Sequence, residues 1–193
     1  MAGRQDEQLA AARLVILGRD GVLNHRADNG MAAPGDWRPI PGSADGVGLL
    51  TRAGYSVCVA TNQPGIGRGE VSRRQLHALH RKMRRLAEGR GGRIDRVEVC
   101  PHGPDDSCPC RKPAPGMLAK LAKRLGVPLA GVPVVGDSRA DIDAARAAGA
   151  RPLLVRTGDG EATLAALQAC GEDIECYKDL LSAAKMLSGD SGG

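Results

Sequence analysis

The stretch that decides the fold is LVILGRDGVLN, residues 14–24, in which a run of branched aliphatic residues passes directly into a polar loop. A short apolar run of this kind is typical of a buried strand in a parallel sheet. The same pattern returns in SVCVATNQPG, residues 56–65, and in VPVVGDS, residues 132–138. Because ligands of such sheets bind beyond the carboxyl ends of the strands, these loops are expected to line one crevice.

Alternation of short apolar runs with helical patterns extends over most of the chain. Strands are expected at Leu14–Leu17, Ser56–Ala60, Val97–Cys100, Val132–Val135 and Pro152–Val155. Helical periodicity marks Ser43–Ala53, Ser72–Glu88, Gly116–Leu125, Arg139–Ala148 and Lys178–Leu187. The order predicts an α/β fold, a Rossmann-like three-layer sandwich with a central parallel sheet. We expect a single domain, 1–193, with a core at about 14–187 and flexible tails at 1–12 and 188–193.

The composition argues against a nucleic-acid partner, although the formal net charge is +5. Trp37, Tyr55 and Tyr177 are the only aromatic residues, so the chain lacks the stacking side chains of a nucleic-acid groove. The basic run at residues 81–85 lies on a helical pattern and is interpreted as a solvated face. The core must therefore be built from Leu, Val, Ile, Ala and Met.

The chain shows no segment that would attach it to a membrane or export it. No apolar run is long enough to cross a bilayer, and residues 1–12 lack the apolar stretch of a signal peptide. These features predict a cytoplasmic protein with no membrane partner, in which cysteines stay reduced. Cys58 is expected to be a small buried hydrophobic residue, and Cys170 and Cys176 have no assigned role.

Four metal-ligand side chains lie close together in CPHGPDDSCPCRKP, residues 100–113. They are Cys100, His102, Cys108 and Cys110. Thiolates and an imidazole at this spacing favour a tetrahedral structural zinc site; the alternative is unrelated cysteines that happen to be close. A metal-stiffened loop would present Arg111 and Lys112 to a phosphate at a fixed angle.

Polar residues at the strand ends suit phosphoryl transfer. Asp20 and Asp137 could hold Mg²⁺ through oxygen, while Thr61 and Asn62 could donate hydrogen bonds to a phosphate whose charge Lys112 neutralises. Each residue also has a plainer interpretation. The pair at 137–138 could cap the following helix, and the pair at 61–62 could form a turn.

Taken together, these motifs resemble those of the haloacid dehalogenase (HAD) superfamily. The resemblance rests on RDGVLN, VATNQPGIGRG, CPH…CPCRKP and VGDSRADIDAA, in this order between residues 14 and 158. More narrowly, the motifs are similar to those of the D-glycero-D-manno-heptose-1,7-bisphosphate 7-phosphatase and histidinol-phosphatase branch. The resemblance implies a HAD-type fold without a large cap domain, and a monomer that removes phosphate from a small phosphorylated sugar in lipopolysaccharide precursor synthesis. Histidinol phosphate is the alternative substrate.

The resemblance also implies a role for individual positions. Asp20 would be the general acid/base and lend its backbone carbonyl to Mg²⁺, with Asp137 as a second ligand; Thr61 and Lys112 would steady the phosphoryl group. Asp141 would support the loop, and Arg68 would either touch substrate or shape the loop at 65–69. The zinc ligands would be Cys100, His102, Cys108 and Cys110. Substrate would meet Arg26, Ala27, Asp28, Asn29, Thr61, Asn62, Gln63, Pro64, Arg111, Lys112 and Ser138.

One departure sits at the centre of the match. The family pattern begins D-x-D, and its first carboxylate attacks phosphorus and also ligates magnesium; this chain has Gly18 there. Glycine supplies neither a nucleophile nor a metal ligand. Asp20 cannot replace it, because residues two apart on a strand end are separated by several ångströms. The sequence therefore predicts very weak phosphatase activity with weakened Mg²⁺ binding, or, as an alternative, a catalytically silent phosphosugar-binding protein.

Overall fold

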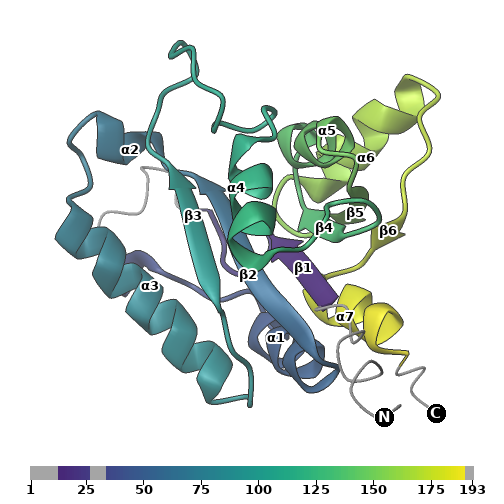
Figure 1. Ribbon diagram of the computed structural model, residues 1–193, viewed down its shortest axis with the longest axis horizontal. Helices are drawn as coiled ribbons and strands as arrows, with labels where there is room; N and C mark the ends of the chain where they lie inside the picture. Colours follow the sequence, from purple (N-terminus) through teal and green to yellow (C-terminus); the bar gives the residue numbers. More distant parts are fainter. Residues whose placement is uncertain (1–12, 27–33, 190–193) are drawn as a thin grey trace, which may run out of the picture.

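The computed structural model describes residues 13–26 and 34–189, and its centre is a six-stranded parallel sheet in the order β3-β2-β1-β4-β5-β6 (Figure 1). Its strands are β1 (Arg13–Leu17), β2 (Tyr55–Asn62), β3 (Arg96–Cys100), β4 (Pro133–Gly136), β5 (Arg151–Val155) and β6 (Cys176–Tyr177). The chain moves outward in one direction from β1 to β3 and in the other from β4 to β6. The order of the strands therefore reverses between β1 and β4, and a ligand crevice is expected at such a reversal.

Helices cover both faces of the sheet, with α1, α3 and α7 on one side and α4, α5 and α6 on the other (Figure 1). Their bounds are α1 (Ser43–Arg52), α2 (Pro64–Gly67), α3 (Arg73–Glu88), α4 (Gly116–Leu125), α5 (Arg139–Ala147), α6 (Gly160–Ala169) and α7 (Leu180–Ser188). A 3₁₀ turn spans Pro34–Asp36. The predicted three-layer α/β architecture is confirmed. Within the described ranges, no helix has the length and apolar character needed to cross a membrane.

The elements differ from the predicted ones mainly at the C-terminal half. All five predicted strands are present, but α2, α6 and the two-residue β6 were not predicted. The last helix begins at Leu180 because Asp179 caps it, its carboxylate accepting a hydrogen bond from Ser182 N at 2.8 Å. Ser188, expected in the tail, ends that helix; residues 1–12 and 190–193 lie outside the described part of the chain.

The core forms on both faces because successive strand side chains point to opposite sides of the sheet. In β1, Val15 and Leu17 pack with α1, α3 and α7, whereas Leu14 and Ile16 pack with α4 and α5. All four side chains are buried. This burial on both faces fixes the register of the central strand, and with it the level at which each following loop leaves the sheet.

The strand register brings three polar loops to one edge. Leu17 of β1 pairs with Val59 of β2 and with Val135 of β4. The two neighbouring strands continue past this level, β2 to Asn62 and β4 to Gly136, and all three strands end at the same edge of the sheet. Gly18 N donates to Val135 O at 2.8 Å and continues the pairing one residue beyond β1.

His80 of α3 is a buried titratable side chain, 8% exposed, whose Nε2 has no hydrogen-bond partner among residues 13–26 and 34–189. Burial first, and then the charges of Arg19 and Arg84, lower its pKa to about 4. An unfolded histidine titrates near 6.5, so the unfolded chain binds more protons between pH 6.5 and 4. Stability must therefore fall as the pH is lowered through this window.

Replacing His80 with glutamine is expected to remove that loss. Between pH 7 and 4.5, the unmodified chain should lose about 2 kcal/mol more unfolding free energy than the His80→Gln variant. Urea unfolding at several pH values measures the difference. His77→Gln on the exposed side of the same helix is the control and should behave as the unmodified chain; equal slopes for His80→Gln and the unmodified chain would contradict the assignment.

Candidate active site

A cavity of about 430 Å³ opens at the carboxyl edge of the sheet, at the reversal in strand order. Ten of the residues expected at the site line it: Asp20, Arg26, Thr61, Asn62, Gln63, Pro64, Arg111, Lys112, Asp137 and Ser138. Among the described residues, its charged lining consists of five basic side chains (Arg19, Arg26, Arg68, Arg111, Lys112) and five acidic ones (Asp20, Glu70, Asp137, Asp141, Asp159). Ala27, Asp28 and Asn29 lie outside the described residues. The three loops predicted to converge therefore do so.

Asp20 is held by three side chains. Its carboxylate accepts hydrogen bonds from Arg19 Nη2 at 2.9 and 3.0 Å, from Asn24 Nδ2 at 2.8 Å and from Gln63 Nε2 at 2.7 Å. Burial opposes ionisation of this group, but the Arg19 charge and these hydrogen bonds outweigh it and lower the pKa of Asp20. Gln63 Nε2 also donates to Thr61 Oγ1 at 2.8 Å, so one amide joins the carboxylate to the threonine.

Arg19 is a site residue that the sequence did not reveal. An arginine after a strand is normally expected at the surface, yet Arg19 is only 2% exposed, and its guanidinium faces the Asp20 carboxylate. Within the described part of the chain, its Nη1 has no hydrogen-bond partner. Removing water from this ion pair strengthens the attraction and fixes the direction of the Asp20 side chain.

Lys112 enters the cavity from the loop after the cysteine cluster and is anchored at both ends. Its backbone N donates to Asn62 Oδ1 at 3.1 Å, and Asn62 Nδ2 donates back to its carbonyl at 3.1 Å. The ammonium donates to Ala60 O at 2.8 Å and to the Asp141 carboxylate. Asn62 therefore holds the lysine loop, and β2 continues through Thr61 and Asn62, so the interpretation of this pair as a turn is wrong.

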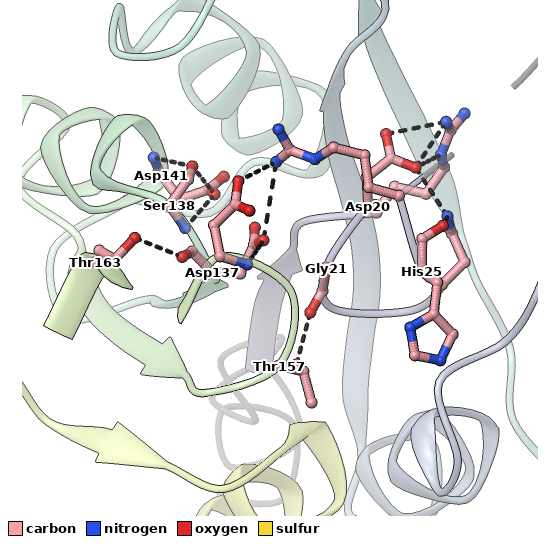
Figure 2. A network of polar contacts seen from close by, with 12 residues as sticks. Asp20, Gly21, His25, Asp137, Ser138, Asp141, Thr157 and Thr163 are labelled. Atoms are coloured by element: carbon pink, nitrogen blue, oxygen red, sulfur yellow. Dashed lines mark hydrogen bonds and ion pairs between the residues drawn. The ribbon is translucent and has the colours of Figure 1, made fainter. Parts of the chain in front are cut away.

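Asp137 lies opposite Asp20, with Gly21 between them (Figure 2). A Cβ on Gly21 would lie 1.9 Å from Asp137 Oδ2, and a Cβ on Gly158 would lie 2.2 Å from it. Both glycines also have positive φ. A larger residue is therefore excluded at each position by the contact with Asp137 and by the backbone conformation. Asp159 N donates to Asp137 Oδ2 at 2.9 Å, which completes the cradle around this carboxylate.

The charge of Asp137 is poorly neutralised. Burial first, and then the neighbouring Asp141 carboxylate, raise the pKa of Asp137 to about 6. Arg26 Nη2 is 3.9 Å away and forms its closer ion pair, at 2.9 Å, with Asp159. A divalent cation bound here would reverse this electrostatic penalty. The donor set therefore suits a hard cation, although Gly18 offers no oxygen beyond its backbone carbonyl.

Ser138 caps the following helix, as the alternative interpretation of residues 137–138 predicted. Its hydroxyl accepts from Asp141 N at 3.3 Å, while the Asp141 carboxylate accepts from Ser138 N at 3.2 Å and from its hydroxyl at 2.5 Å. This capping box begins α5. Asp137, one residue earlier, is left facing the cavity. In the stretch GDS, residues 136–138, Ser138 thus caps the helix while the adjacent Asp137 lines the site.

Position 18 is compatible with a side chain. Gly18 is absent from the glycines with positive φ, so its backbone does not require glycine. A Cβ there would lie 3.0 Å from Val22 Cγ2, 3.5 Å from Val135 O and 3.7 Å from Asp141 Oδ1. Its nearest polar side-chain neighbour would be the carboxylate that binds Lys112. A side chain at this position would therefore lie within contact distance of Val22 and Asp141.

The cysteine cluster assembles beside the cavity, from the last residue of β3 and the loop that follows it. The ligand atoms of Cys100, His102, Cys108 and Cys110 all lie within 4.8 Å of one another. Neighbouring pairs are 3.3 to 3.8 Å apart, with His102 presenting Nδ1. A tetrahedron built on metal–sulfur bonds of about 2.3 Å has edges of about 3.8 Å, so the cluster could hold a metal ion.

Hydrogen bonds tie this loop to its surroundings. Gln63 N donates to Cys100 O at 2.7 Å, and Gly116 N donates to Pro109 O at 3.0 Å. Arg111 Nη1 donates to His102 O at 2.9 Å, so part of its guanidinium serves the loop while the residue also lines the cavity. The cluster is thereby connected to the residues that position Lys112.

Comparison with known proteins identifies the family. A model described as HAD-hydrolase-like matches residues 109–183. D-glycero-beta-D-manno-heptose-1,7-bisphosphate 7-phosphatase of Pseudomonas putida is 45% identical over 175 residues, which cover 91% of this chain and 99% of the relative. The protein of the same name from Bordetella bronchiseptica is 46% identical over 175 residues, or 91% and 97% of the two chains. The chain belongs to this heptose-bisphosphate phosphatase family.

Solved structures of the family agree with the fold. The D,D-heptose 1,7-bisphosphate phosphatase from Bordetella bronchiseptica, crystallised with magnesium and phosphate, matches with a TM-score of 0.87 and 44% identity, covering 93% of this chain and 99% of that one. The enzyme from Burkholderia thailandensis matches with a TM-score of 0.70 and 39% identity over the same shares. The predicted superfamily, branch and phosphatase class are confirmed.

Proposed function

We propose that this chain recognises D-glycero-D-manno-heptose 1,7-bisphosphate and hydrolyses its 7-phosphate only very slowly. The proposal rests on the convergence of Lys112, Thr61 and Asp137 on one cavity, in a chain whose relatives carry that enzyme name. The slow rate follows from Gly18, because the position from which the family's carboxylate would attack phosphorus carries no side chain. The role in lipopolysaccharide precursor synthesis belongs to the same proposal.

Within this proposal each residue acts on a particular atom. The Lys112 ammonium and the Thr61 hydroxyl hold the phosphoryl oxygens, and Arg111 reaches the sugar phosphate. Asp20 acts as the general acid/base: because its pKa is lowered in the free protein, it first takes up a proton, then gives it to the leaving sugar oxygen, and finally takes one from the water that follows. Magnesium would be held by the Asp137 carboxylate and the Asp20 backbone carbonyl, where it would neutralise phosphate charge. One carboxylate ligand fewer makes that binding weaker.

The cysteine cluster is proposed to bind zinc. Three thiolates and one imidazole are the donors that zinc prefers, and the spacing of the four ligand atoms suits its bond lengths. The role is structural, because a closed set of four protein ligands leaves no open position for a substrate.

A catalytically silent phosphosugar-binding protein is the second candidate. The observation that favours it is again Gly18, since all the charged groups that would grip a phosphate remain in place while the attacking group is missing. Turnover separates the two candidates, and ligand binding supports both.

Binding of the heptose bisphosphate is expected to depend on Lys112. A hydrogen bond to a charged group contributes about 1.5–3 kcal/mol, so Lys112→Met should weaken binding by roughly 10- to 150-fold in calorimetric titrations with Mg²⁺. Lys123→Met, on the exposed face of α4, is the matched control and should bind unchanged.

Two results would count against the proposed substrate. Equal affinity of the Lys112→Met variant and the unmodified chain would remove the lysine from the phosphate site. Tighter binding of histidinol phosphate than of the heptose bisphosphate would favour the histidinol-phosphatase branch.

A further inference from the structure

Gln63 lies between two groups of the cavity on which the proposed chemistry depends. Its Nε2 donates one hydrogen bond to Asp20 Oδ2 at 2.7 Å and another to Thr61 Oγ1 at 2.8 Å. The first bond fixes the orientation of the amide, because an ionised carboxylate can only accept. A side-chain amide has two N–H donors, so both are used within the protein. Gln63 therefore has no side-chain N–H left for a substrate, although it lines the cavity.

The main chain of Gln63 is held from two sides. Its backbone N donates to Cys100 O at 2.7 Å, and its carbonyl accepts from Ile66 N at 3.1 Å. Thr61, two residues earlier, belongs to β2, and the register with β3 pairs it with Val99. The amide of Gln63 and the hydroxyl of Thr61 are therefore held in place before a ligand binds.

The direction of hydrogen bonding at Thr61 follows from this contact. A hydroxyl has one O–H donor and two acceptor lone pairs. Because Gln63 Nε2 is the donor, Thr61 Oγ1 is the acceptor, and the hydroxyl proton is not used in this bond. Among residues 13–26 and 34–189 no acceptor for that proton is found, and the buried Thr61 lines the cavity. The proton is therefore available to an oxygen that enters from the cavity.

We infer that Gln63 is a positioning residue and not a substrate ligand, because its amide fixes the Thr61 hydroxyl as a donor toward the phosphate. This differs from the expectation, based on the resemblance, that Gln63 itself meets substrate. The inference rests on the proposed function, in which Thr61 holds a phosphoryl oxygen. A fixed donor matches an oxygen that presents a lone pair and opposes one that carries a proton. This position therefore selects an unprotonated phosphoryl oxygen.

Substitutions at the two positions should differ in their effect on phosphate binding. Thr61→Val removes a hydrogen bond to a charged acceptor, which should weaken binding by roughly 10- to 150-fold. Gln63→Glu keeps the size of the side chain but offers only acceptors to Thr61, so it takes the hydroxyl proton and should cost at least about tenfold. Gln63→Met offers no strong donor or acceptor and leaves the hydroxyl its three staggered positions, so it should cost only about threefold.

The experiment titrates inorganic phosphate into each protein by calorimetry with excess Mg²⁺, after thermal unfolding has shown that the variant folds. Gln168→Glu, on the exposed side of α6, makes the same charge change outside the cavity and should bind as the unmodified chain does. A double-mutant cycle separates the effect of the proton from that of the added charge. In the Thr61→Val background, Gln63→Glu should cost at least about fivefold less affinity, because no hydroxyl proton is left to be diverted.

The outcomes distinguish this inference from the proposed function. Equal losses for Gln63→Glu and Gln63→Met, or an equal cost of Gln63→Glu with and without the Thr61 hydroxyl, would overturn the inference alone. If Gln63→Glu does not fold, Gln63→Met decides, because a loss of about tenfold or more would make Gln63 a direct ligand. Phosphate binding that is unaffected by both Thr61→Val and Lys112→Met would reject the proposed phosphate site, and the inference with it.

Discussion

Replacing Gly18 with aspartate is expected to raise phosphate release from the heptose bisphosphate by about 10⁵- to 10⁶-fold, which corresponds to roughly 7–8 kcal/mol of transition-state stabilisation. The change restores an attacking carboxylate and a magnesium ligand together. The backbone accepts it, because φ at this position is not positive, and Val22 must give way by only a few tenths of an ångström. A coupled phosphate assay with Mg²⁺ measures both proteins.

Gly18→Asn is the matched control for this variant. It has nearly the same shape as aspartate but no anionic oxygen, so it should stay near the rate of the unmodified chain. If the aspartate variant folds poorly, adding Val22→Ala relieves the 3.0 Å contact. Similar high rates in the unmodified chain and in Gly18→Asp would show that phosphorus is attacked from another group, and would refute the assignment.

Loss of the metal from the cysteine cluster is expected to lower the melting temperature by roughly 6–12 °C. The figure corresponds to about 3 kcal/mol for a chain of this length. This loss of unfolding free energy is smaller than the apparent binding free energy of zinc in small peptides, because the sheet of this chain is expected to fold without the metal. The measurements are zinc content and thermal unfolding, before and after chelation and in Cys110→Ser.

Cys170→Ser supplies the control for the cysteine substitution, since Cys170 is exposed and distant in sequence from the cluster. It should keep both the metal and the melting temperature. Less than about half an equivalent of zinc in chelator-free protein would contradict the proposed site. An unchanged melting temperature after complete removal would contradict its structural role.

The sequence predicted those elements whose signal is local. Each of the five predicted strands is a short run of branched residues, and the ends of the observed strands differ by at most two residues. The two-residue β6 is too short for a periodic signal. Helix α6 begins at Gly160, without a side-chain cap, and its apolar residues do not form a clear stripe. Both elements are held by packing against β5 rather than by their own sequence.

The same distinction explains which site residues were found. Asp20, Thr61 and Asp137 could be predicted because each lies within three residues of the end of an apolar run. The burial of Arg19 and the cradle made by Gly158 could not, because they depend on contacts between segments far apart in the chain. The pairing of Asn62 with the Lys112 backbone is of the same kind, since 50 residues separate the two. No spacing rule encodes such contacts.

The Asp141 carboxylate joins the beginning of α5 to the Lys112 ammonium, using one oxygen for each. The side-chain torsions of Lys112 are therefore fixed before a ligand binds. Binding then costs little additional side-chain entropy at this contact. A substitution that loosens the first turn of the helix would then weaken anion affinity from a distance, without touching the ligand. Selection on folding and selection on recognition act here on one side chain.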